Sequence, residues 1–426
     1  MDFSNLPRNN CYCIDAKSFY ASVECVLRGL DPLTTYLAVV GSLDRSGAVV
    51  LAASPLMKRD FKIKTGTRHY EIPKHPHIHV VEARMGLYLD FSMKIPKILQ
   101  RFTPLEAITI YSVDECFFTV DGAENLFGDK FSIARQVQAA IKKEIGVPTA
   151  VGCGENYYQS KVALDCLAKR NEATGYIEGV TYETFADKMW PTPIKDIWGI
   201  GSRIEKRLHR LGIYTLGDVA KYPLNLLKKQ FGNAIGQELY NHSWGIDLTN
   251  PYYKPQINQT TNLHQKGFSA GITLLRDYQG AEIYPAILDQ VEEVTRRARA
   301  SKMAGRTITL AVGFSHTLGG GGFSQAKTVH NPTNITMDIY EVCREIFNKH
   351  YEGQVVRNLH VSLTNLTQDE IVQLDLFEDK TKQREIGYVM DSIKNKFGST
   401  AIFRATSLME GGTALARAGT IGGHKA

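Results

Sequence analysis

The sequence predicts a multidomain protein of the α+β class, and three observations support this fold class. The chain has 426 residues, which suggests about three domains, more than one hydrophobic core can serve. Residues 197–218 have the glycine spacing of a helix-hairpin-helix, a purely helical motif. Beyond residue 266, strand and helix patterns follow each other in the order βαββαβ.

The composition is that of a globular protein with a mild positive charge. Hydrophobic residues make up 43% of the chain, charged residues 22%, and the formal net charge is +6. This charge is compatible with nucleic-acid binding but does not identify it. Residues Met1 to Asn10 lack the apolar core of a signal peptide, and no apolar run is long enough to span a membrane. We therefore expect a cytoplasmic protein without membrane contact.

Cysteine usage agrees with a reducing compartment. The seven cysteines are scattered through apolar surroundings and show no paired C-x-x-C spacing. We therefore expect buried free thiols rather than disulfides or zinc ligands. These residues are Cys11, Cys13, Cys25, Cys116, Cys153, Cys166 and Cys343.

The stretch Ala107 to Asp121 holds an acidic pair, Asp114 and Glu115, between two runs typical of β-strands. Neighbouring side chains on a straight strand point to opposite faces, but at a bend both carboxylates can converge. Two adjacent carboxylates at the edge of a buried sheet favour a divalent metal, and hard oxygen ligands suit magnesium. Taken alone, however, the stretch is explained better by a solvated turn, because acidic residues are common in turns.

A third acid, Asp15, ends the first apolar run, which begins at Cys11. A helical pattern follows from Ser18 to Leu27, so Asp15 lies where a strand gives way to a helix. Open sheets tend to place their chemistry at the ends of strands. Asp15 is therefore a candidate to join the acidic pair.

Strands and helices alternate through the rest of the first half. Four histidines lie between residues 69 and 79, interrupted by Pro73 and Pro76, which favours a loop leading into a strand over a zinc site. These are His69, His75, His77 and His79. The expected strands are Tyr36–Gly41, Gly47–Leu51 and Thr149–Gly152, and the expected helices are Ser54–Phe61, Met85–Phe102, Phe131–Ile145 and Ser160–Lys169.

Gly199 and Gly201 precede a predicted helix from Arg203 to Leu211. Glycines in such a hairpin let backbone N–H groups approach a phosphate, and the helix N-terminus adds a favourable dipole. An ordinary connection between two helices with glycine caps is the alternative. Basic residues on the helix favour phosphate binding, namely Lys206, Arg207 and Arg210.

A polar segment, residues 251–265, is expected to be a linker to the second half. Three arginines crowd one end of the long helix in that half, and we expect Arg296, Arg297 and Arg299 to contact nucleic acid. A solvated basic face is the alternative. The predicted order is strand Gly267–Leu274, helix Ala281–Ala300, strands Thr307–Phe314 and Phe323–Val329, helix Thr333–Lys349 and strand Val355–Leu363.

The last part of the chain begins with the short motif Gln373-Leu-Asp-Leu-Phe377. After it, Arg384 to Phe397 has the pattern of an amphipathic helix. The glycine-rich segment Gly411 to Ala426 is expected to be loosely ordered.

Read together, these motifs resemble the Y-family of DNA polymerases, most closely its UmuC-like branch. The resemblance spans nearly the whole chain in order and at family spacing. It departs from the family pattern at Leu56, where many relatives have tyrosine, and at Lys17, where many have Asp or Asn. The residues that carry it are Asp15-Ala-Lys-Ser-Phe-Tyr-Ala-Ser-Val-Glu24, Ser112-Val-Asp-Glu115, Gly152-Cys-Gly-Glu-Asn156 with Lys161 and Lys169, and Trp198-Gly-Ile-Gly201.

The resemblance implies a right-hand polymerase with palm, small fingers, helical thumb and a DNA-binding little finger. Such an enzyme is a low-fidelity, template-directed DNA polymerase that extends a primer past damaged template bases. The implied domains are a catalytic palm (1–31 and 83–180), fingers (32–82), a thumb with the helix-hairpin-helix (181–250), a linker (251–265), a βαββαβ little finger (266–370) and a tail with a clamp-binding motif (371–426).

The resemblance also implies a set of site residues. Nucleotidyl transfer uses two Mg²⁺ ions, and three carboxylates are enough to hold such a pair. By resemblance the metal ligands are Asp15, Asp114, Glu115 and the backbone carbonyl of Ala16. The implied substrate-binding residues are Ala16, Phe19 and Tyr20, with Tyr20 excluding a ribose 2′-hydroxyl, and the triphosphate cations Arg59 and Lys169.

The implied partners are primer–template DNA, deoxynucleoside triphosphates, a sliding clamp and a recombinase filament or accessory subunit. Gln373, Leu376 and Phe377 resemble a bacterial clamp-binding motif, an extended peptide with two apolar anchors, although an ordinary tail segment is the alternative. Two other classes of protein share some of these features. A two-metal helix-hairpin-helix nuclease would not need a sugar-gate tyrosine, and a non-catalytic DNA-binding repair adaptor would not need three acids.

Overall fold

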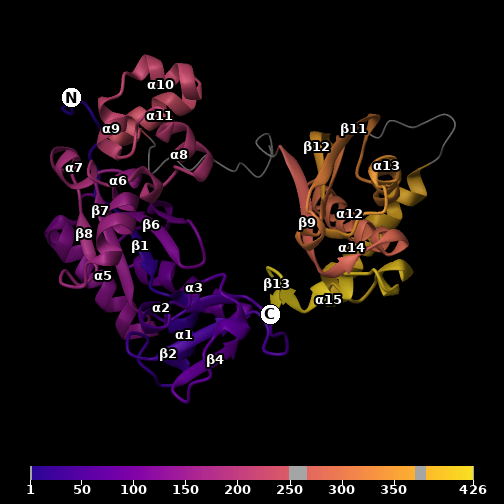
Figure 1. The fold of residues 1–426 in the computed structure, drawn as a ribbon, viewed down its shortest axis with the longest axis horizontal. Helices are drawn as coiled ribbons and strands as arrows, with labels where there is room; N and C mark the ends of the chain where they lie inside the picture. Colours follow the sequence, from indigo (N-terminus) through magenta and orange to yellow (C-terminus); the bar gives the residue numbers. More distant parts are fainter. Residues whose placement is uncertain (1, 249–265, 370–379, 426) are drawn as a thin grey trace. The chain divides into compact units, whose positions relative to one another are not determined.

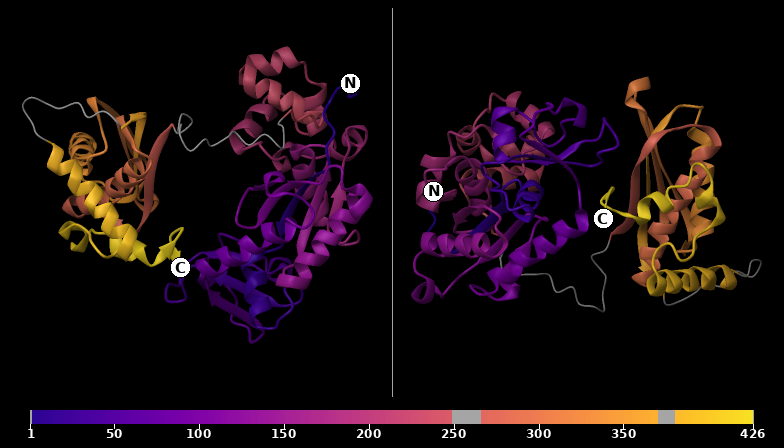
Figure 2. Two further views of the ribbon diagram at one scale, coloured as in Figure 1. Left: turned by 180° about the vertical axis from the view of Figure 1, so that it is seen from behind. Right: turned by 90° about the horizontal axis from the view of Figure 1, so that it is seen from below.

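The computed structural model describes residues 2–248, 266–369 and 380–425, and the chain divides into two compact units (Figures 1 and 2). The first unit comprises Met1–Pro255 with His424–Ala426, and the second comprises Gln256–Gly423. The predicted linker lies outside the described residues. None of the helices in the described part of the chain combines the length and apolar character that crossing a membrane requires.

A five-stranded sheet forms the centre of the first unit. Its strands lie in the order β5-β6-β1-β7-β8, with β1 antiparallel to both neighbours and β7 parallel to β8. Three helices supply apolar residues to the core beside it, including Val23, Tyr88 and Ile133. The elements are β1 (Cys11–Ala16), β5 (Ile108–Ile110), β6 (Glu115–Thr119), β7 (Thr149–Gly154), β8 (Ile177–Gly179), α1 (Phe19–Leu27), α3 (Met85–Leu99), α4 (Glu124–Phe127) and α5 (Lys130–Ile145).

A smaller sheet in the order β3-β2-β4 lies between α1 and α3 in the sequence. The predicted pair of strands is confirmed as antiparallel β2 and β3, and the histidine-rich loop leads into β4, which runs parallel to β2. Met57 of the helix α2 packs into the core of this sheet. The elements are β2 (Tyr36–Val40), β3 (Val50–Ala53), α2 (Pro55–Asp60) and β4 (Ile78–Glu82).

The end of the first unit is helical, as the sequence predicts. Thr215 caps α9 by accepting a hydrogen bond from the Asp218 N–H, and the Asp218 carboxylate accepts one from the Thr215 N–H. Leu208, Val219 and Leu227 lie in a separate core within this region. The helices are α6 (Tyr157–Val162), α7 (Tyr182–Met189), α8 (Ser202–His209), α9 (Leu216–Lys221), α10 (Leu224–Phe231) and α11 (Asn233–Ser243).

The second unit confirms the predicted βαββαβ order. Its four antiparallel strands lie in the order β11-β10-β12-β9, and both helices pack their apolar faces against the sheet in one core. Figure 1 shows α12 and α13 beside this sheet. The elements are β9 (Gly267–Tyr278), α12 (Ile283–Ala300), β10 (Met303–Phe314), β11 (Gly322–Thr333), α13 (Thr336–His350) and β12 (Val356–Gln368).

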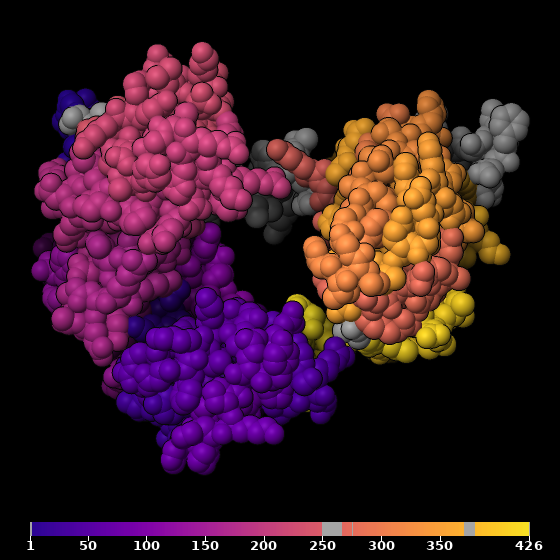
Figure 3. All heavy atoms as spheres, viewed as in Figure 1, coloured from indigo at the N-terminus to yellow at the C-terminus, as the bar shows by residue number. Residues whose placement is uncertain are grey.

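The C-terminal segment packs against α12 of the second unit, where Figure 3 shows its yellow residues against the salmon-coloured ones. The predicted amphipathic helix is confirmed as α14 (Thr381–Phe397), and α15 (Ala414–Ala418) and two short strands, β13 (Thr420–Ile421) and β14 (His424–Lys425), follow. The expectation of loose order from Gly411 onward is wrong for its first residues. A Cβ atom at Gly411 would lie 1.8 Å from the Glu282 carbonyl oxygen, so this glycine permits close packing rather than disorder.

Candidate active site

The strand pair β1–β6 brings two of the three predicted acids face to face. Asp15 is the register partner of Glu115, and the Ala16 N–H donates to the Asp114 carbonyl oxygen over 2.9 Å. The chain bends just before β6, where the N–H groups of Tyr111 and Ser112 both donate to the Glu115 carbonyl at 3.0 Å. The predicted bend between two strands is therefore confirmed.

A buried lysine, Lys161, and a partly exposed one, Lys169, accompany the carboxylates. The side chains of Asp15 and Glu115 are 16% and 8% exposed. Lys169 Nζ lies 2.8 Å from Asp15 Oδ2, and Lys161 Nζ forms an ion pair with Glu115 Oε1. Burial raises the pKa of Asp15 to about 6, although the charge of Lys169 works against this rise. In the space-filling view, indigo residues from the first part of the chain lie at the bottom of a hollow in the first unit (Figure 3).

Two glycines of β7 explain how the lysines come so close to the sheet. A Cβ atom at Gly152 would lie 2.1 Å from the Ser160 carbonyl oxygen, and one at Gly154 would lie 2.5 Å from the Ser160 nitrogen. Only a strand without side chains at these positions can pack directly against α6. Because β7 is the neighbour of β1, this packing carries Lys161 to the acids.

The prediction of one regular helix from Ser160 to Lys169 is wrong. Three conformations follow one another: α6 ends at Val162, a π-helical turn covers Ala163–Leu167, and a 3₁₀ turn covers Ala168–Arg170. Local propensity does not distinguish a π-turn from an α-helix, so the sequence pattern could not reveal it.

Sequence reasoning missed one carboxylate of this site, Asp165. Its two oxygens contact both lysines, Oδ2 at 3.0 Å from Lys161 Nζ and Oδ1 at 2.9 Å from Lys169 Nζ. The Lys-x-x-x-Asp-x-x-x-Lys spacing of residues 161–169 is the sequence signal that could have identified it.

The donor set of the site suits a hard cation. Asp15, Asp114 and Glu115 offer only carboxylate oxygens, and the raised pKa of Asp15 means that its ionised form gains from a nearby positive charge. As the described residues stand, no three carboxylate, imidazole or thiol side chains are close enough to hold a metal ion. In this structure, Asp15 and Glu115 instead pair with Lys169 and Lys161. The four histidines of residues 69–79 likewise form no such group.

The two aromatic residues after Asp15 have different surroundings. Phe19 is 3% exposed and lies in the hydrophobic core, so its side chain does not face a substrate. Tyr20 is half-buried and stacks on Tyr88, with ring centroids 4.5 Å apart. Burial and the charge of Asp114 raise the pKa of Tyr20. Tyr20 is therefore held rigidly at the edge of the site.

Of the two basic residues in α2, Lys58 rather than Arg59 is directed to the acids. Arg59 is 71% exposed and pairs with Asp60, Nε to Oδ1, over 2.6 Å. Lys58 Nζ instead donates to Ser18 Oγ over 2.8 Å. Lys58, like Arg59, belongs to the exposed residues of α2. Partial desolvation of its ammonium group and the charge of Lys169 nevertheless lower the pKa of Lys58, while the charges of Asp15 and Asp114 work against this lowering. The cap residue Ser54, whose side chain accepts from the Met57 N–H, fixes the start of this helix at the position that the sequence predicts.

The glycines of the predicted hairpin are exposed, and Gly201 is the N-cap of α8. Gly199 has a φ of 90°, which only glycine adopts easily. Gly201 has a φ of −79°, and a Cβ atom there would meet nothing within 4 Å. Its place at the N-cap is one where glycine is common, and the exposed backbone there is open to a ligand.

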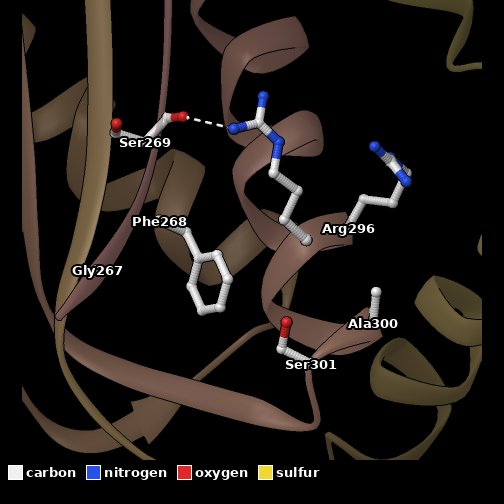
Figure 4. A pocket seen from close by; sticks show the side chains of 7 residues that line it. Gly267, Phe268, Ser269, Arg296, Ala300 and Ser301 are labelled. Atoms are coloured by element: carbon white, nitrogen blue, oxygen red, sulfur yellow. Dashed lines mark hydrogen bonds between the residues drawn. The ribbon is translucent and has the colours of Figure 1, made fainter. Parts of the chain in front are cut away.

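The three arginines of α12 do not share one environment. Arg296 and Arg297, 36% and 44% exposed, both pair with Glu293. They line a pocket of about 460 Å³ between α12 and the start of β9, where Arg297 donates to the Ser269 carbonyl oxygen (Figure 4). Arg299 is 5% exposed and forks onto Asp391 of α14. A direct contact of Arg299 with nucleic acid is therefore excluded by its burial.

The cysteines and the clamp-binding motif are the remaining predicted features. All seven cysteines are buried and free, as expected. Gln373, Leu376 and Phe377 lie outside the described residues, between the end of β12 and the start of α14.

Sequence profiles of known families match three parts of the chain. The profile of the impB/mucB/samB family matches residues 14–165, and the profile of its C-terminal domain matches residues 265–376. Between them, residues 195–247 match the thumb domain of DNA polymerase-iota.

Two proteins of Bacillus subtilis (strain 168) resemble the chain over its length. The chain is 46% identical to the putative UV-damage repair protein UvrX, over 100% of both chains. It is 39% identical to DNA polymerase IV 2, over 97% of this chain and 98% of that relative. Among solved structures, a Y-family DNA polymerase chimera matches with a TM-score of 0.64 and 20% identity, covering 84% of this chain and 99% of the chimera. This structural similarity shows the fold.

Proposed function

The chain belongs to the impB/mucB/samB family, the Y-family of DNA polymerases, and we propose that Asp15, Asp114 and Glu115 are its catalytic carboxylates. The protein is a DNA-directed DNA polymerase of the translesion class, with DNA and deoxynucleoside triphosphates as substrates. Membership of the family also implies dependence on a divalent metal ion. The nuclease and the non-catalytic adaptor are not favoured by these similarities.

One observation carries the assignment of the site. The antiparallel register of β1 and β6 sets Asp15 opposite Glu115, and the Ala16–Asp114 hydrogen bond holds the backbone of Asp114 beside the end of β1, which supports the assignment. Buried carboxylates at a strand end need positive charge, which two lysines supply in this structure. When substrates bind, a cation would neutralise the carboxylates, and the triphosphate would neutralise the lysines.

We propose Mg²⁺ as the metal, with Asp15, Asp114, Glu115 and the Ala16 carbonyl as ligands, since all are hard oxygen donors. Two such ions, when bound, lower the pKa of the primer 3′-hydroxyl and stabilise the leaving pyrophosphate. Glu115 then lies on the primer side. Ser112 Oγ donates to Asp114 Oδ1 over 2.6 Å and so orients that carboxylate.

Lys58 and Lys169 are the proposed cations for the triphosphate. The charge of Asp15 acts on both ammonium groups, although the two lysines lie far apart in the sequence. Each can donate to phosphate oxygens as a point charge. The pair of Arg59 with Asp60, and the charges of Asp15 and Asp114 that act on Lys58, favour Lys58 over Arg59 for the role that the family pattern gives to Arg59.

Tyr20 is the proposed sugar gate. A rigid ring at the site leaves no space for a ribose 2′-hydroxyl, and the stack on Tyr88 supports this rigidity. Tyr20→Ala should therefore raise ribonucleotide incorporation, by about tenfold on the scale of one lost steric contact. A primer-extension assay with ribonucleoside and deoxyribonucleoside triphosphates measures the ratio. Unchanged sugar discrimination would contradict the assignment.

The predicted domain boundaries are carried over as proposals: palm at 1–31 and 83–180, fingers at 32–82, thumb at 181–250 and little finger at 266–370. In the thumb, Gly199 and Gly201 offer exposed backbone to DNA phosphates. In the little finger, Arg296 and Arg297 are the proposed phosphate contacts, while Arg299 serves the packing of α14.

Partners beyond the substrates are proposed from sequence. Gln373, Leu376 and Phe377 would bind a sliding clamp, and a recombinase filament or accessory subunit would join at the damaged site. The proposed location is the cytoplasm. Deleting residues 373–377 should reduce clamp-stimulated synthesis and leave synthesis without the clamp unchanged, and equal loss of both would refute the clamp assignment.

One assay tests the class of enzyme. The protein is incubated with a labelled primer–template, Mg²⁺ and the four deoxynucleoside triphosphates, with Asp114→Ala as the control against contaminants. Extension of the primer is expected for the wild type and no extension for the variant. Shortening of the primer would instead indicate a nuclease, and no change would indicate a binding protein.

A further inference from the structure

Asp165 links the two lysines of the site into one chain of alternating charges. Lys161 joins it to Glu115, and Lys169 joins it to Asp15, with the two lysine contacts of Asp165 at 3.0 and 2.9 Å. The side chain of Asp165 is 25% exposed, so the carboxylate is only partly screened by water. Its two oxygens serve different lysines, which means that one carboxylate fixes both ammonium groups.

The backbone is adapted to this arrangement. Residues 161, 165 and 169 are spaced by four, and in a regular α-helix the first and third would diverge by about 80° around the axis. The π-turn at Ala163–Leu167 lies between the two lysines. It places more residues in one turn and so counteracts that divergence. Such π-turns within helices occur frequently at functional sites.

We propose that Asp165 is a positioning residue that holds Lys169 beside the incoming triphosphate when Asp15 turns to its metal ion. This inference rests on the proposed function, because it assigns Lys169 to the nucleotide. In the structure, Asp15 and Asp165 share the Lys169 ammonium. Once Asp15 binds a cation, its hold on Lys169 weakens, and Asp165 is the carboxylate that remains.

An ammonium group has three N–H donors, so Lys169 can keep Asp165 and still donate to a phosphate oxygen. Without the charge of Asp165, Lys169 depends on Asp15 alone and competes directly with the cation. Lys161 and Lys169 also lose the anion between them and repel each other. Both effects weaken nucleotide binding and leave the chemical step itself intact.

The test measures nucleotide binding without chemistry. Wild type and Asp165→Asn are bound to a primer–template with a dideoxy-terminated primer, and the complementary deoxynucleoside triphosphate is titrated in the presence of Mg²⁺. We expect about tenfold weaker binding for the variant, the loss of one charge-assisted hydrogen bond. In steady-state extension, the same variant should show a raised KM with kcat changed much less. Equal nucleotide affinity of both proteins would overturn the proposal.

Asp196→Asn is the matched control, since Asp196 is a nearby carboxylate that pairs with Arg170 at 3.4 Å and has no contact with either lysine in the described structure. It should bind nucleotide as the wild type does. Thermal unfolding must give similar melting temperatures for all variants. Should Asp165→Asn fail to fold, Asp165→Glu replaces it, with about threefold weaker binding expected because its carboxylate is displaced. Wild-type affinity in that variant would equally overturn the proposal.

A double-mutant cycle separates positioning from a general structural effect. If Asp165 acts through Lys169, then Asp165→Asn adds little to the loss caused by Lys169→Gln. Additive losses would overturn the positioning role. Failure of the proposed function gives a different result: wild-type protein that neither extends primers nor binds the nucleotide refutes the polymerase site, whereas normal wild-type binding with an unaffected Asp165→Asn refutes only this inference.

Discussion

The two units of the protein each bury an acid with a basic partner, but the partners differ. In the first unit, Lys169 Nζ contacts Asp15 through one oxygen, Oδ2, at 2.8 Å, and the same ammonium group also pairs with Asp165. In the second unit, Arg299 holds Asp391 through two parallel hydrogen bonds of 2.6 and 3.0 Å and also donates to the Asn334 carbonyl. A lysine is a point charge on a flexible chain, whereas a guanidinium fork fits one carboxylate in one geometry.

The difference agrees with the roles proposed for the two pairs. Under the proposed function, the pair at Asp15 opens when substrates bind, because the acid and the lysine would then have separate tasks. The pair at Asp391 has no such task and joins α14 to α12 (Figure 1). Gly387 supports this reading, since a Cβ atom there would lie 3.2 Å from the Arg299 guanidinium. The same kind of interaction is thus exchangeable in one unit and fixed in the other.

The largest effect is expected from the acids of the first unit. Asp114→Ala and Asp15→Asn should each reduce primer extension by about a thousandfold or more, because each removes charge where the transferred phosphate is stabilised. Burial works against the ionised form of Asp15, so Asp15→Asn should not lower the melting temperature. Extension rates and thermal unfolding together check both statements. Loss of stability in Asp15→Asn would mean that the Asp15–Lys169 pair is structural, like its counterpart.

Arg299→Ala should destabilise the second unit by about 3–5 kcal/mol, because it leaves Asp391 buried without a partner. The matched control is Arg297→Ala, which removes a half-exposed arginine two residues away and should cost less than about 1 kcal/mol. Urea unfolding of the two variants measures the difference. A small loss for Arg299→Ala would show that the fork is dispensable and would remove the contrast between the units.

A substitution of Glu24 can test whether a carboxylate paired with arginine has a fixed, structural role in the first unit as well. Its side chain is fully buried and accepts hydrogen bonds from Arg84, Arg28 and Tyr88. Burial alone would raise the pKa of Glu24, but these partners outweigh it and hold that pKa below the usual 4.5. Glu24→Gln should cost about 2–3 kcal/mol at neutral pH, less than a fully buried pair because both arginines are partly exposed.

The sign of the pH dependence follows from that shift. A carboxylate with a lowered pKa in the folded state stabilises the protein above its unfolded pKa of 4.5, and this contribution is lost as the pH falls through 4.5 and below. Unfolding free energies of wild type and Glu24→Gln should therefore converge at acid pH. A difference that stays constant across this range would assign the loss to packing instead of charge.

The smallest expected effect distinguishes two neighbours in α2. Lys58→Ala should raise the KM for deoxynucleoside triphosphates about tenfold, because it removes one charge from the triphosphate. Arg59→Ala should leave KM close to the wild-type value, since Arg59 is exposed and already paired. Steady-state extension at varied nucleotide concentration compares them. The reverse order would restore Arg59 to the role that the family pattern implies.

Most elements of the fold could be predicted because their signals are local. The hairpin around Asp114 and the βαββαβ order of the second half each follow from the periodicity of apolar residues within a few positions. The predictions failed where distant segments meet. The glycine-rich composition predicts a loosely ordered chain from Gly411 onward, yet Gly411 packs against Glu282, more than a hundred residues away in the sequence.

By itself, the sequence determined which residue types are present and in what order: three acids, two strand ends and a hairpin with glycines. That was sufficient for the family and for the places of the acids in the fold, because a strand end and a bend are local features. Only the tertiary structure decided the basic partners. Whether Lys58 or Arg59 reaches the acids depends on the direction of one helix, and the place of Asp165 depends on a π-turn held against Gly152 of β7. The ion pairs of Lys161 with Glu115 and of Lys169 with Asp15 join residues far apart in the chain, so a one-dimensional pattern cannot assign them.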